Sequence, residues 1–245
     1  MAAERAPIHD SMIPAEQTGL QPITPSIAGE GRNKDVLLRA WVSDVREMDF
    51  TNTEELQRFV ELLNSPDNKP HFAGPPASVE ELSEMALNRS HHFLSATNSF
   101  GEVIGGMLIE DAPPGQHDHW LRLAVVDPEL QSPAPGIGYG VGKAMLRKGI
   151  DWAATTPTYY GRRRYKLDAS VIMGVKGWIK MQHILMRKLA FQVRMILPNQ
   201  VDFENPKTGI TSRKSTKRFE LNLDMWRSLR ELEPPVEKPQ VSVGK

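Results

Sequence analysis

The pattern of apolar and polar positions divides the central part of the chain into strands and helices. Helices are predicted at residues 53–64 and 78–88, where apolar residues recur every three or four positions. Ser78 and Glu81 have the spacing of a capping box, which marks the start of the second helix. Short apolar or alternating runs bounded by turn residues predict strands. These runs are 36–45, 93–97, 102–110, 118–126, 165–172, 191–196 and 218–223.

Both ends of the chain lack this pattern. They are rich in proline, glycine and charged residues, and such segments bury too little apolar surface to offset the entropy lost on folding. We therefore predict a flexible tail at residues 1–33, one domain at 34–226 and a second flexible tail at 227–245.

The segment 123–146 carries most of the functional information. An apolar strand leads into a turn broken by prolines, then four glycines at alternate positions, Gly136, Gly138, Gly140 and Gly142, and then a helix. Glycines leave backbone N–H groups accessible, and the start of a helix favours an anionic group. The segment therefore predicts a site for a phosphate-bearing ligand.

Two familiar nucleotide-binding loops do not match this segment. A Walker A loop needs a glycine five positions before Gly142 and a hydroxyl residue after Lys143, but the chain has Ile137 and Ala144 there. The dinucleotide fingerprint G-x-G-x-x-G fails in every register of the glycine run. An ATPase and a Rossmann dinucleotide site are both disfavoured.

The remaining pattern resembles the central motif of the GNAT superfamily of acetyl-CoA-dependent N-acetyltransferases. The residues that carry the resemblance are Leu123, Val125, Pro128, Gln131 and the run 140–146. Downstream, residues 165–172 and 185–191 resemble the family's fifth strand and the end of the helix that follows it. The resemblance implies a mixed α/β fold in which helices flank a mostly antiparallel sheet.

The resemblance also implies an activity and a set of cofactor contacts. Acetyl-CoA would donate an acetyl group to a primary amine of a small molecule or protein, by direct attack in a ternary complex and without a metal. Strand amides would hold the pantetheine chain and the thioester oxygen, and loop amides would hold the pyrophosphate. The expected cofactor-binding residues are Leu123, Val125, Val126, Gln131, Gly136, Gly138, Gly140, Val141, Gly142 and Lys143.

Two departures from the family pattern leave an alternative open. The family's Gln/Arg-x-x-Gly-x-Gly/Ala spacing is not met strictly, which an insertion at 132–135 would explain. Met186 stands where many members carry the tyrosine that protonates the leaving thiolate. The alternative is a catalytically weak GNAT-like module that binds an acyl-CoA or a protein partner.

His119 and Tyr165 are the candidate catalytic residues. Alternation along the strand puts His119 on one face with Leu121, Leu123 and Val125. Histidine has a reference pKa of about 6.5, which suits a general base near neutrality. The other interpretation of His119 is an exposed histidine at the start of a strand. Tyr165 is a candidate for the missing general acid, together with Tyr159 and Tyr160.

A metal site at His117 and His119 with Glu110 and Asp111 is the weaker interpretation of those residues; the alternative is that the two carboxylates attract a cationic amine substrate. They do not form the set of three ligands, with supporting contacts, that catalytic zinc sites use. The basic run 162–164 beside tyrosines suggests nucleic-acid contact. A solvated loop, or a loop near the coenzyme's phosphate, is favoured instead, so neither a metal nor a nucleic acid is expected.

Composition sets wide limits on partners and location. Thirty basic and thirty acidic residues cancel, so no net charge favours nucleic acid or an anionic membrane. The chain has no cysteine, which excludes disulfides, cysteine-ligated zinc and a catalytic thiol. Residues 1–33 do not resemble a signal peptide, and no apolar run is long enough to span a bilayer. We expect a cytoplasmic protein without membrane contact, and a homodimer remains one option for its oligomeric state.

Overall fold

The fold is known from a computed structural model. It describes residues 40–69, 78–131, 140–175, 177–205 and 208–235. Most of the strand predicted at 36–45 lies outside the described residues, as do the N-terminal tail, Gly136 and Gly138.

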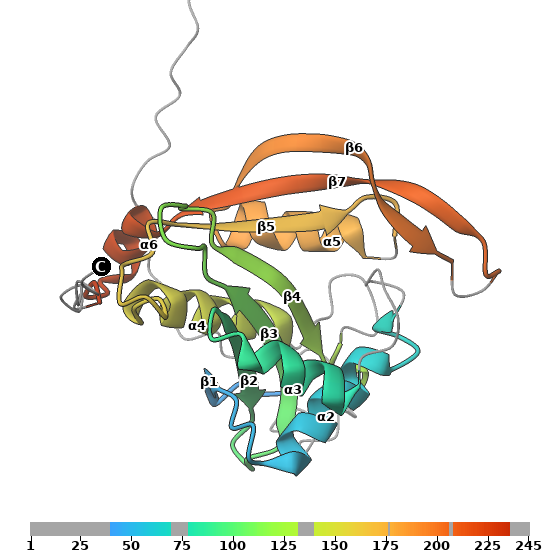
Figure 1. The fold of residues 1–245 in the computed structure, drawn as a ribbon, viewed down its shortest axis with the longest axis horizontal. Helices are drawn as coiled ribbons and strands as arrows, with labels where there is room; N and C mark the ends of the chain where they lie inside the picture. Colours follow the sequence, from blue (N-terminus) through green and yellow to red (C-terminus); the bar gives the residue numbers. More distant parts are fainter. Residues whose placement is uncertain (1–39, 70–77, 132–139, 176, 206–207, 236–245) are drawn as a thin grey trace, which may run out of the picture. The chain divides into compact units, whose positions relative to one another are not determined.

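Seven strands form one sheet in the order β1-β2-β3-β4-β5-β7-β6 (Figure 1). The strands are β1 Asp44–Glu47, β2 His91–Thr97, β3 Val103–Glu110, β4 Trp120–Val126, β5 Lys166–Ile172, β6 Gln192–Glu204 and β7 Thr211–Asn222. Neighbouring strands are antiparallel except β4 and β5, which are parallel. The predicted mixed α/β architecture with a mostly antiparallel sheet is therefore confirmed.

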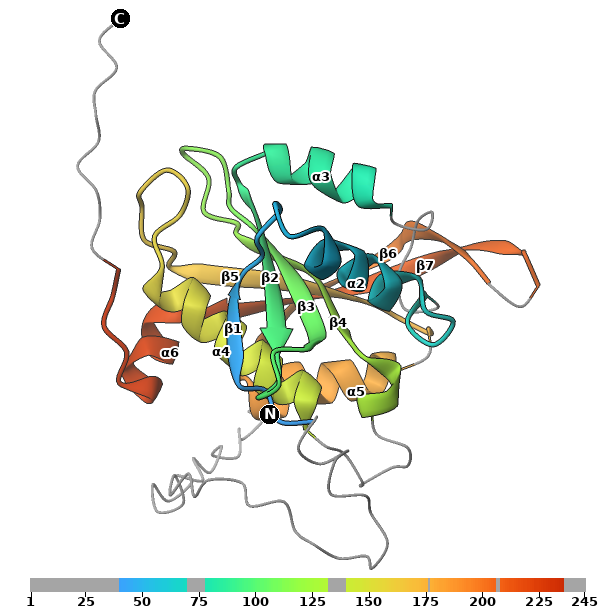
Figure 2. The same ribbon diagram turned by 90° about the horizontal axis from the view of Figure 1, so that it is seen from below.

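Helices cover both faces of the sheet (Figure 2). The helical segments are α2 Thr53–Asn64, α3 Val79–Leu87, η2 Pro128–Leu130, α4 Val141–Thr155, α5 Trp178–His183, the π-helical η3 Ile184–Lys188 and α6 Leu223–Arg230. The capping box of Ser78 and Glu81 is present as predicted. Helix α6 runs across the predicted domain end at residue 226. Among the described residues, no helix has the length and apolar character that a membrane span requires.

The buried apolar side chains form two clusters, one on each face of the sheet. Phe59 and Leu62 of α2 pack with Phe93 on one face, here called the α2 face. Met145 and Ile150 of α4 pack on the other, here called the α4 face, together with side chains of α6. Successive residues of a strand point to opposite faces, so the central strands supply side chains to both clusters. Because both faces are buried, these strands are mostly apolar rather than alternating.

A β-bulge in β4 changes the predicted alternation of that strand. Leu123 pairs with Leu108 of β3 and Leu121 with the next residue, Ile109, so Arg122 is an extra residue without a partner on β3. Leu121 therefore packs on the α4 face, whereas Leu123 and Val125 pack on the α2 face. The sequence predicted that His119, Leu121, Leu123 and Val125 share one face of the sheet. That prediction was wrong, because the bulge puts Leu123 and Val125 on the face opposite Leu121.

The last two strands are much longer than the sequence predicted. Strands were expected at 191–196 and 218–223, whereas β6 and β7 continue toward each other and pair from Glu204 and Thr211 onward. Beyond the end of β5 this hairpin extends alone (Figure 1). Most of β6 is exposed, so its sequence has no buried face to produce an apolar alternation.

Substitution of Gly106 in β3 tests the packing of the α2 face. A Cβ atom there would lie 2.5 Å from the Phe59 ring and 2.8 Å from the Leu94 carbonyl oxygen. We expect Gly106→Ala to lower the free energy of unfolding by about 1–3 kcal/mol, measured by urea denaturation. Gly142→Ala is the control, because its Cβ would meet nothing nearer than a Val126 methyl group at 3.5 Å. Equal stability of the two variants would contradict this packing.

Candidate active site

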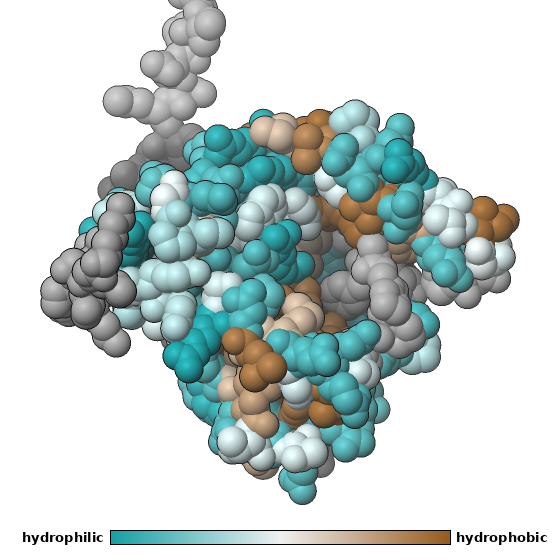
Figure 3. All heavy atoms as spheres, viewed as in Figure 1, coloured by the Kyte–Doolittle hydropathy of each residue, from teal (hydrophilic) through white to brown (hydrophobic). Residues whose placement is uncertain are grey.

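Strands β4 and β5 pair over two positions and then diverge. Trp120 pairs with Asp168 and Leu121 with Ala169, and no later pair joins the two strands. The edge of β4 that faces β5 therefore has no strand partner from Arg122 to Val126, and we call it the open edge. In the space-filling view the surface is indented between α3 and the β5–β7 side (Figure 3).

The direction of the amides shows which residues serve the open edge. The N–H of Asp127 donates to the Ile104 carbonyl, 2.9 Å away and on the β3 side. Alternate residues of a strand direct their amides to the same side, so Leu123 and Val125 also direct theirs to β3. The amides of Ala124 and Val126 face the open edge. Of the three strand residues expected to hold a cofactor, Val126 is the one whose amide lies there.

The Gln131 side chain contacts the end of β4 and the segment after α2. Its side-chain amide donates to the Val126 carbonyl at 3.1 Å and to Asn68 Oδ1 at 2.6 Å. Asn68 donates to the same carbonyl at 3.0 Å. Gln131 therefore joins the end of β4 to the segment that follows α2, and its expected role in cofactor binding stays a prediction.

Helix α4 begins beside the open edge. Gly140 is its N-cap, with a left-handed φ of +76° that glycine adopts without strain, and no side chain caps the first turn. Val141 is buried, and Gly142 lies beside the Val126 side chain, with a Val126 methyl group 3.5 Å from where a Cβ atom would be. The first N–H groups of a helix have no intrahelical partner. The α4 start thus presents unpaired donors next to β4.

Three cationic side chains surround this helix start. Burial lowers the pKa of Lys143, and the nearby charges of Arg147 and Lys188 lower it further. The Nε of Arg147 is buried and has no hydrogen-bond partner among the described residues. Like charges that repel one another and an unpaired guanidinium N–H are both stabilised by a bound anion. The α4 start therefore has the charge and the donors to hold a phosphate group, and the expected role of Lys143 stays a prediction.

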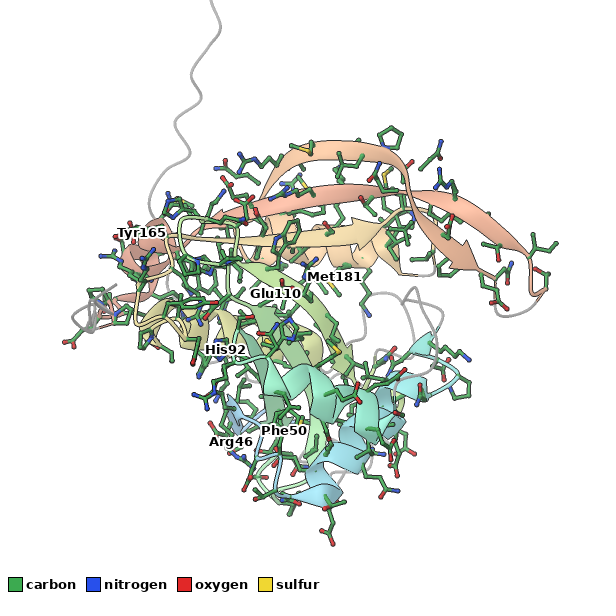
Figure 4. All side chains as sticks on the ribbon, viewed as in Figure 1. Arg46, Phe50, His92, Glu110, Tyr165 and Met181 are labelled. Carbon is green, nitrogen blue, oxygen red and sulfur yellow. The ribbon has the colours of Figure 1, made fainter. Side chains whose placement is uncertain are left out.

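On the α2 face, charged residues surround Trp120 where β4 and β5 begin to diverge. The bulged Arg122 pairs with Glu110 of β3 and lies 5.0 Å from the centre of the Trp120 ring. Arg218 of β7 lies 4.3 Å from that ring and donates to Asp168 Oδ2 at 2.6 Å. We call these five residues the Trp120 cluster; Figure 4 labels Glu110. Sequence patterns gave no signal for the cluster, since its members come from four different strands.

A buried ion pair joins the ends of β3 and β5. Asp111 and Arg164 are both fully buried, and the carboxylate accepts from Arg164 Nε at 2.7 Å and from Nη2 at 3.1 Å. Arg164 also donates to the carbonyls of Ala153 and Thr156 at the end of α4. The interpretation of the basic run 162–164 as solvated was wrong for Arg164, because the carboxylate and two carbonyls replace its water.

His92 extends this ion pair into a chain of hydrogen bonds. Its Nε2 lies 2.8 Å from Asp111 Oδ2 and its Nδ1 lies 2.7 Å from Glu47 Oε1. Burial opposes a charge on His92, but the bonds to both carboxylates outweigh it and raise the pKa of His92 above its ordinary value. Burial likewise opposes ionisation of Asp111, and hydrogen bonds from His119, His92 and Arg164 hold its pKa well below the usual range. No local sequence pattern indicates this role, because the two carboxylates come from β1 and from the end of β3.

His119 joins the same network rather than standing exposed. It is buried, and its Nδ1 lies 3.2 Å from the amide nitrogen of Ala112 and 3.3 Å from Asp111 Oδ1. It leaves the sheet on the α4 face with Leu121, opposite the Trp120 cluster. Its role as general base stays a prediction.

Tyr165 lies at the closed end of the β4–β5 pair, beside α6 (Figure 4). Its side chain is half exposed and stacks with Arg163, and its carbonyl accepts from the amide of Leu223. Met186 lies in η3 and is partly exposed. No described contact joins Tyr165 to the open edge, and its role as general acid stays a prediction.

The histidines and carboxylates at the β3–β4 turn do not gather into a metal site. Among the described residues, no group of three or more such side chains has the arrangement to hold an ion. Asp118, for example, pairs with Lys166 at 2.6 Å instead. The expectation that no metal is used stays a prediction.

The raised pKa of His92 predicts how stability depends on pH. Protonated His92 stabilises the fold below the unfolded-state pKa of about 6.5, and this contribution is lost as the pH rises through the higher folded-state pKa. We expect the free energy of unfolding to fall between pH 6 and pH 9 in the native protein, and to fall less in His92→Gln. Urea denaturation across this range measures it. His183→Gln, an exposed control, should keep the native slope; an unchanged slope in His92→Gln would contradict the account.

Comparison with known proteins was made for sequence and structure. No protein-family model and no curated protein sequence matches this chain. Spermidine N-acetyltransferase from Vibrio cholerae, in complex with CoA and spermine, matches with a TM-score of 0.56 and 13% identity, over 74% of this chain and 95% of that one. An N-acetyltransferase from Staphylococcus aureus Mu50 matches with a TM-score of 0.52 and 17% identity, over 74% and 98%.

A third structure carries the family name. It is a protein from Desulfovibrio desulfuricans named as an acetyltransferase of the GNAT family, with a TM-score of 0.51 and 16% identity over 74% of this chain and 98% of that one. The resemblance to this superfamily, expected from the segment 123–146, is confirmed at the level of the fold. With its parallel β4–β5 pair that diverges at a bulge, the chain has the fold of the GNAT N-acetyltransferases.

Proposed function

We propose that this protein is an N-acetyltransferase that transfers an acetyl group from acetyl-CoA to a primary amine. The observation that carries the proposal is the open edge of β4 next to the cationic start of α4. One part offers a strand edge to an extended chain, and the other offers donors and charge to phosphates. Coenzyme A contains both an extended pantetheine chain and phosphate groups.

The described residues fit the cosubstrate at two points. Lys143, Arg147 and Lys188 would neutralise its phosphates, and the unpaired amides at the start of α4 would donate to the pyrophosphate. The amides of Ala124 and Val126 would pair with the pantetheine chain and the thioester oxygen. When bound, the cosubstrate supplies an activated acyl thioester. The protein polarises that carbonyl through backbone donors that need no reorganisation.

Two groups on opposite faces of the sheet, near the start of β4, are candidates to receive the amine proton. His119 is the residue that the strand pattern suggested; its Nδ1 accepts from the Ala112 amide and lies 3.3 Å from Asp111 Oδ1. Glu110 lies in the Trp120 cluster beside the bulge and is partly exposed. Which of the two acts as the base depends on the face of the sheet from which the amine approaches, since a general base must reach the proton it removes.

The carboxylates near Trp120 support an amine as the acceptor substrate. Asp168 has a buried Oδ1 without a hydrogen-bond partner among the described residues, and Glu110 lies on the same face. The Vibrio cholerae neighbour was solved with spermine, an amine. We propose a small-molecule or protein amine as acceptor, attacked directly in a ternary complex, in a cytoplasmic protein.

A specific observation favours a second function. The described tyrosine nearest in sequence to β5, Tyr165, is at the closed end of the strand pair, and Met186 has no ionisable group to protonate a thiolate. An acyl-CoA-binding module with weak or no turnover would not need a general acid at either position. Binding of acetyl-CoA without thiol release on any amine favours this module.

Arg147 tests the phosphate site. We expect Arg147→Met to weaken CoA binding by about tenfold, because it removes a charge-assisted hydrogen bond to a phosphate. Isothermal titration calorimetry measures the affinity. Lys148→Met is the matched control on the same helix, since Lys148 donates to the Ser43 carbonyl and not to the α4 start. Equal affinity of both variants would show that the phosphates bind elsewhere.

Variants of His119 and Glu110 distinguish the two candidate bases in a thiol-release assay over a panel of amines. We expect the variant of the true base, His119→Ala or Glu110→Gln, to lower turnover by about a hundredfold. Its affinity for acetyl-CoA should change little. Native turnover in both variants would leave neither residue as the base and would contradict this part of the proposal.

A further inference from the structure

Helix α3 lies at the surface of the molecule and buries little of itself (Figure 2). Leu82 is its one buried residue. Leu87 is 82% exposed, more than any other large apolar side chain among the described residues, and Met85 is exposed as well. A surface helix normally turns its apolar residues toward the core, so apolar side chains on its outer side indicate contact with another molecule.

Two exposed tyrosines and an arginine continue this surface beyond the end of α3. Arg89 Nη1 lies 3.4 Å from the Tyr159 hydroxyl oxygen, and Tyr160 packs edge-on against the Tyr159 ring with 5.2 Å between the ring centres. The amide of Tyr159 donates to the buried Asp111 Oδ2 at 2.8 Å, which fixes this loop to the sheet. Tyrosine and arginine are the side chains that contribute most to binding in protein interfaces, and those held in place lose little entropy.

The charges of this surface are separated along α3. Glu80 and Glu84 are exposed one turn apart near its start, and Arg89 is exposed just after its end. In the described part of the chain, none of the three belongs to an ion pair. We call the whole set the α3 surface: Glu80, Glu84, Met85, Leu87, Arg89, Tyr159 and Tyr160.

A surface that is acidic at one end and basic at the other is complementary to an antiparallel copy of itself. Residues 80 and 89 are equally far in sequence from the midpoint between residues 84 and 85. A two-fold axis at that midpoint would place Glu80 of each protomer opposite Arg89 of the other and bring the two Met85 side chains together. The same contact then forms twice, and the assembly closes at two chains.

We propose that the α3 surface is a homodimer interface in which the α3 helices of two protomers pack antiparallel. A partner of uniform charge would match one end of the surface and repel the other, whereas a second copy matches both. The exposed Leu87 and the two tyrosines supply the apolar contact area, and the Glu80–Arg89 pairs set the register. The proposal does not depend on acetyl transfer.

The first test is the mass of the full chain in solution, measured by analytical ultracentrifugation. We expect a dimer whose dissociation constant rises with salt, because its charge pairs are exposed. Leu87→Ser should raise the dissociation constant at least about tenfold, since it removes the most exposed apolar contact. Ile179→Ser is the matched control: Ile179 is 66% exposed on α5, which packs on the α4 face, and its loss should leave the dimer unchanged.

The second test exchanges the charges. Arg89→Glu and Glu80→Arg should each raise the dissociation constant at least about tenfold, because like charges then meet at both ends of the interface. An equimolar mixture of the two variants should dimerise as the native chain does. In the mixed dimer each end again joins an acidic and a basic residue. Circular dichroism of each variant shows whether its fold is native.

Three results would overturn the proposal. The first is a native chain that stays monomeric at about 100 μM. The second is a native dissociation constant in Leu87→Ser, which would place the interface elsewhere. The third is a mixture of Arg89→Glu and Glu80→Arg that dimerises no better than either variant alone. The mixture decides the question even if Leu87→Ser does not fold.

Discussion

The buried ion pair of Asp111 and Arg164 determines where the central strands are held together. It ties the end of β3 to Arg164, two residues before β5, and to two carbonyls at the end of α4. Removing one partner of such a pair leaves a buried charge and costs about 3–5 kcal/mol. His92 of β2 adds a hydrogen bond to Asp111, and Nδ1 of His119 accepts one from the Ala112 amide beside it. This end of the sheet is consequently closed, and β4 and β5 pair only beside it.

The opposite end of the strand pair is open for a related reason. Because β4 carries an extra residue at Arg122, its pleat inverts and its course departs from that of β5. Helix α4 starts beside the freed edge, with Gly140 in a left-handed conformation and Lys143 and Arg147 in the first two turns. A fixed closed end, a bulge and a helix start thus generate adjacent sites for an extended chain and for phosphates, which is why we propose an acyl-CoA enzyme.

Much of this fold could be predicted from sequence, because its helices and central strands bury at least one face. Helix 53–64 was predicted to the residue, since its apolar positions repeat every three or four residues. The length of β6 was missed because that strand is exposed, and the bulge at Arg122 leaves no apolar pattern. The glycine loop and Lys143 were found as candidates from local spacing. Glu110 and Asp111 were noted only as carboxylates near two histidines. The ion pair of Asp111 with Arg164 and the assembly of the Trp120 cluster were missed, because tertiary contacts alone bring these residues together.

The most direct test of the central claim is a crystal structure of the full chain with CoA. The account predicts the pyrophosphate at the start of α4, within hydrogen-bonding distance of the Gly142 amide and of Arg147. It predicts the pantetheine chain along the open edge, paired with the amides of Ala124 and Val126. A CoA molecule bound elsewhere, or a complex in which these two amides have no ligand, would contradict the account.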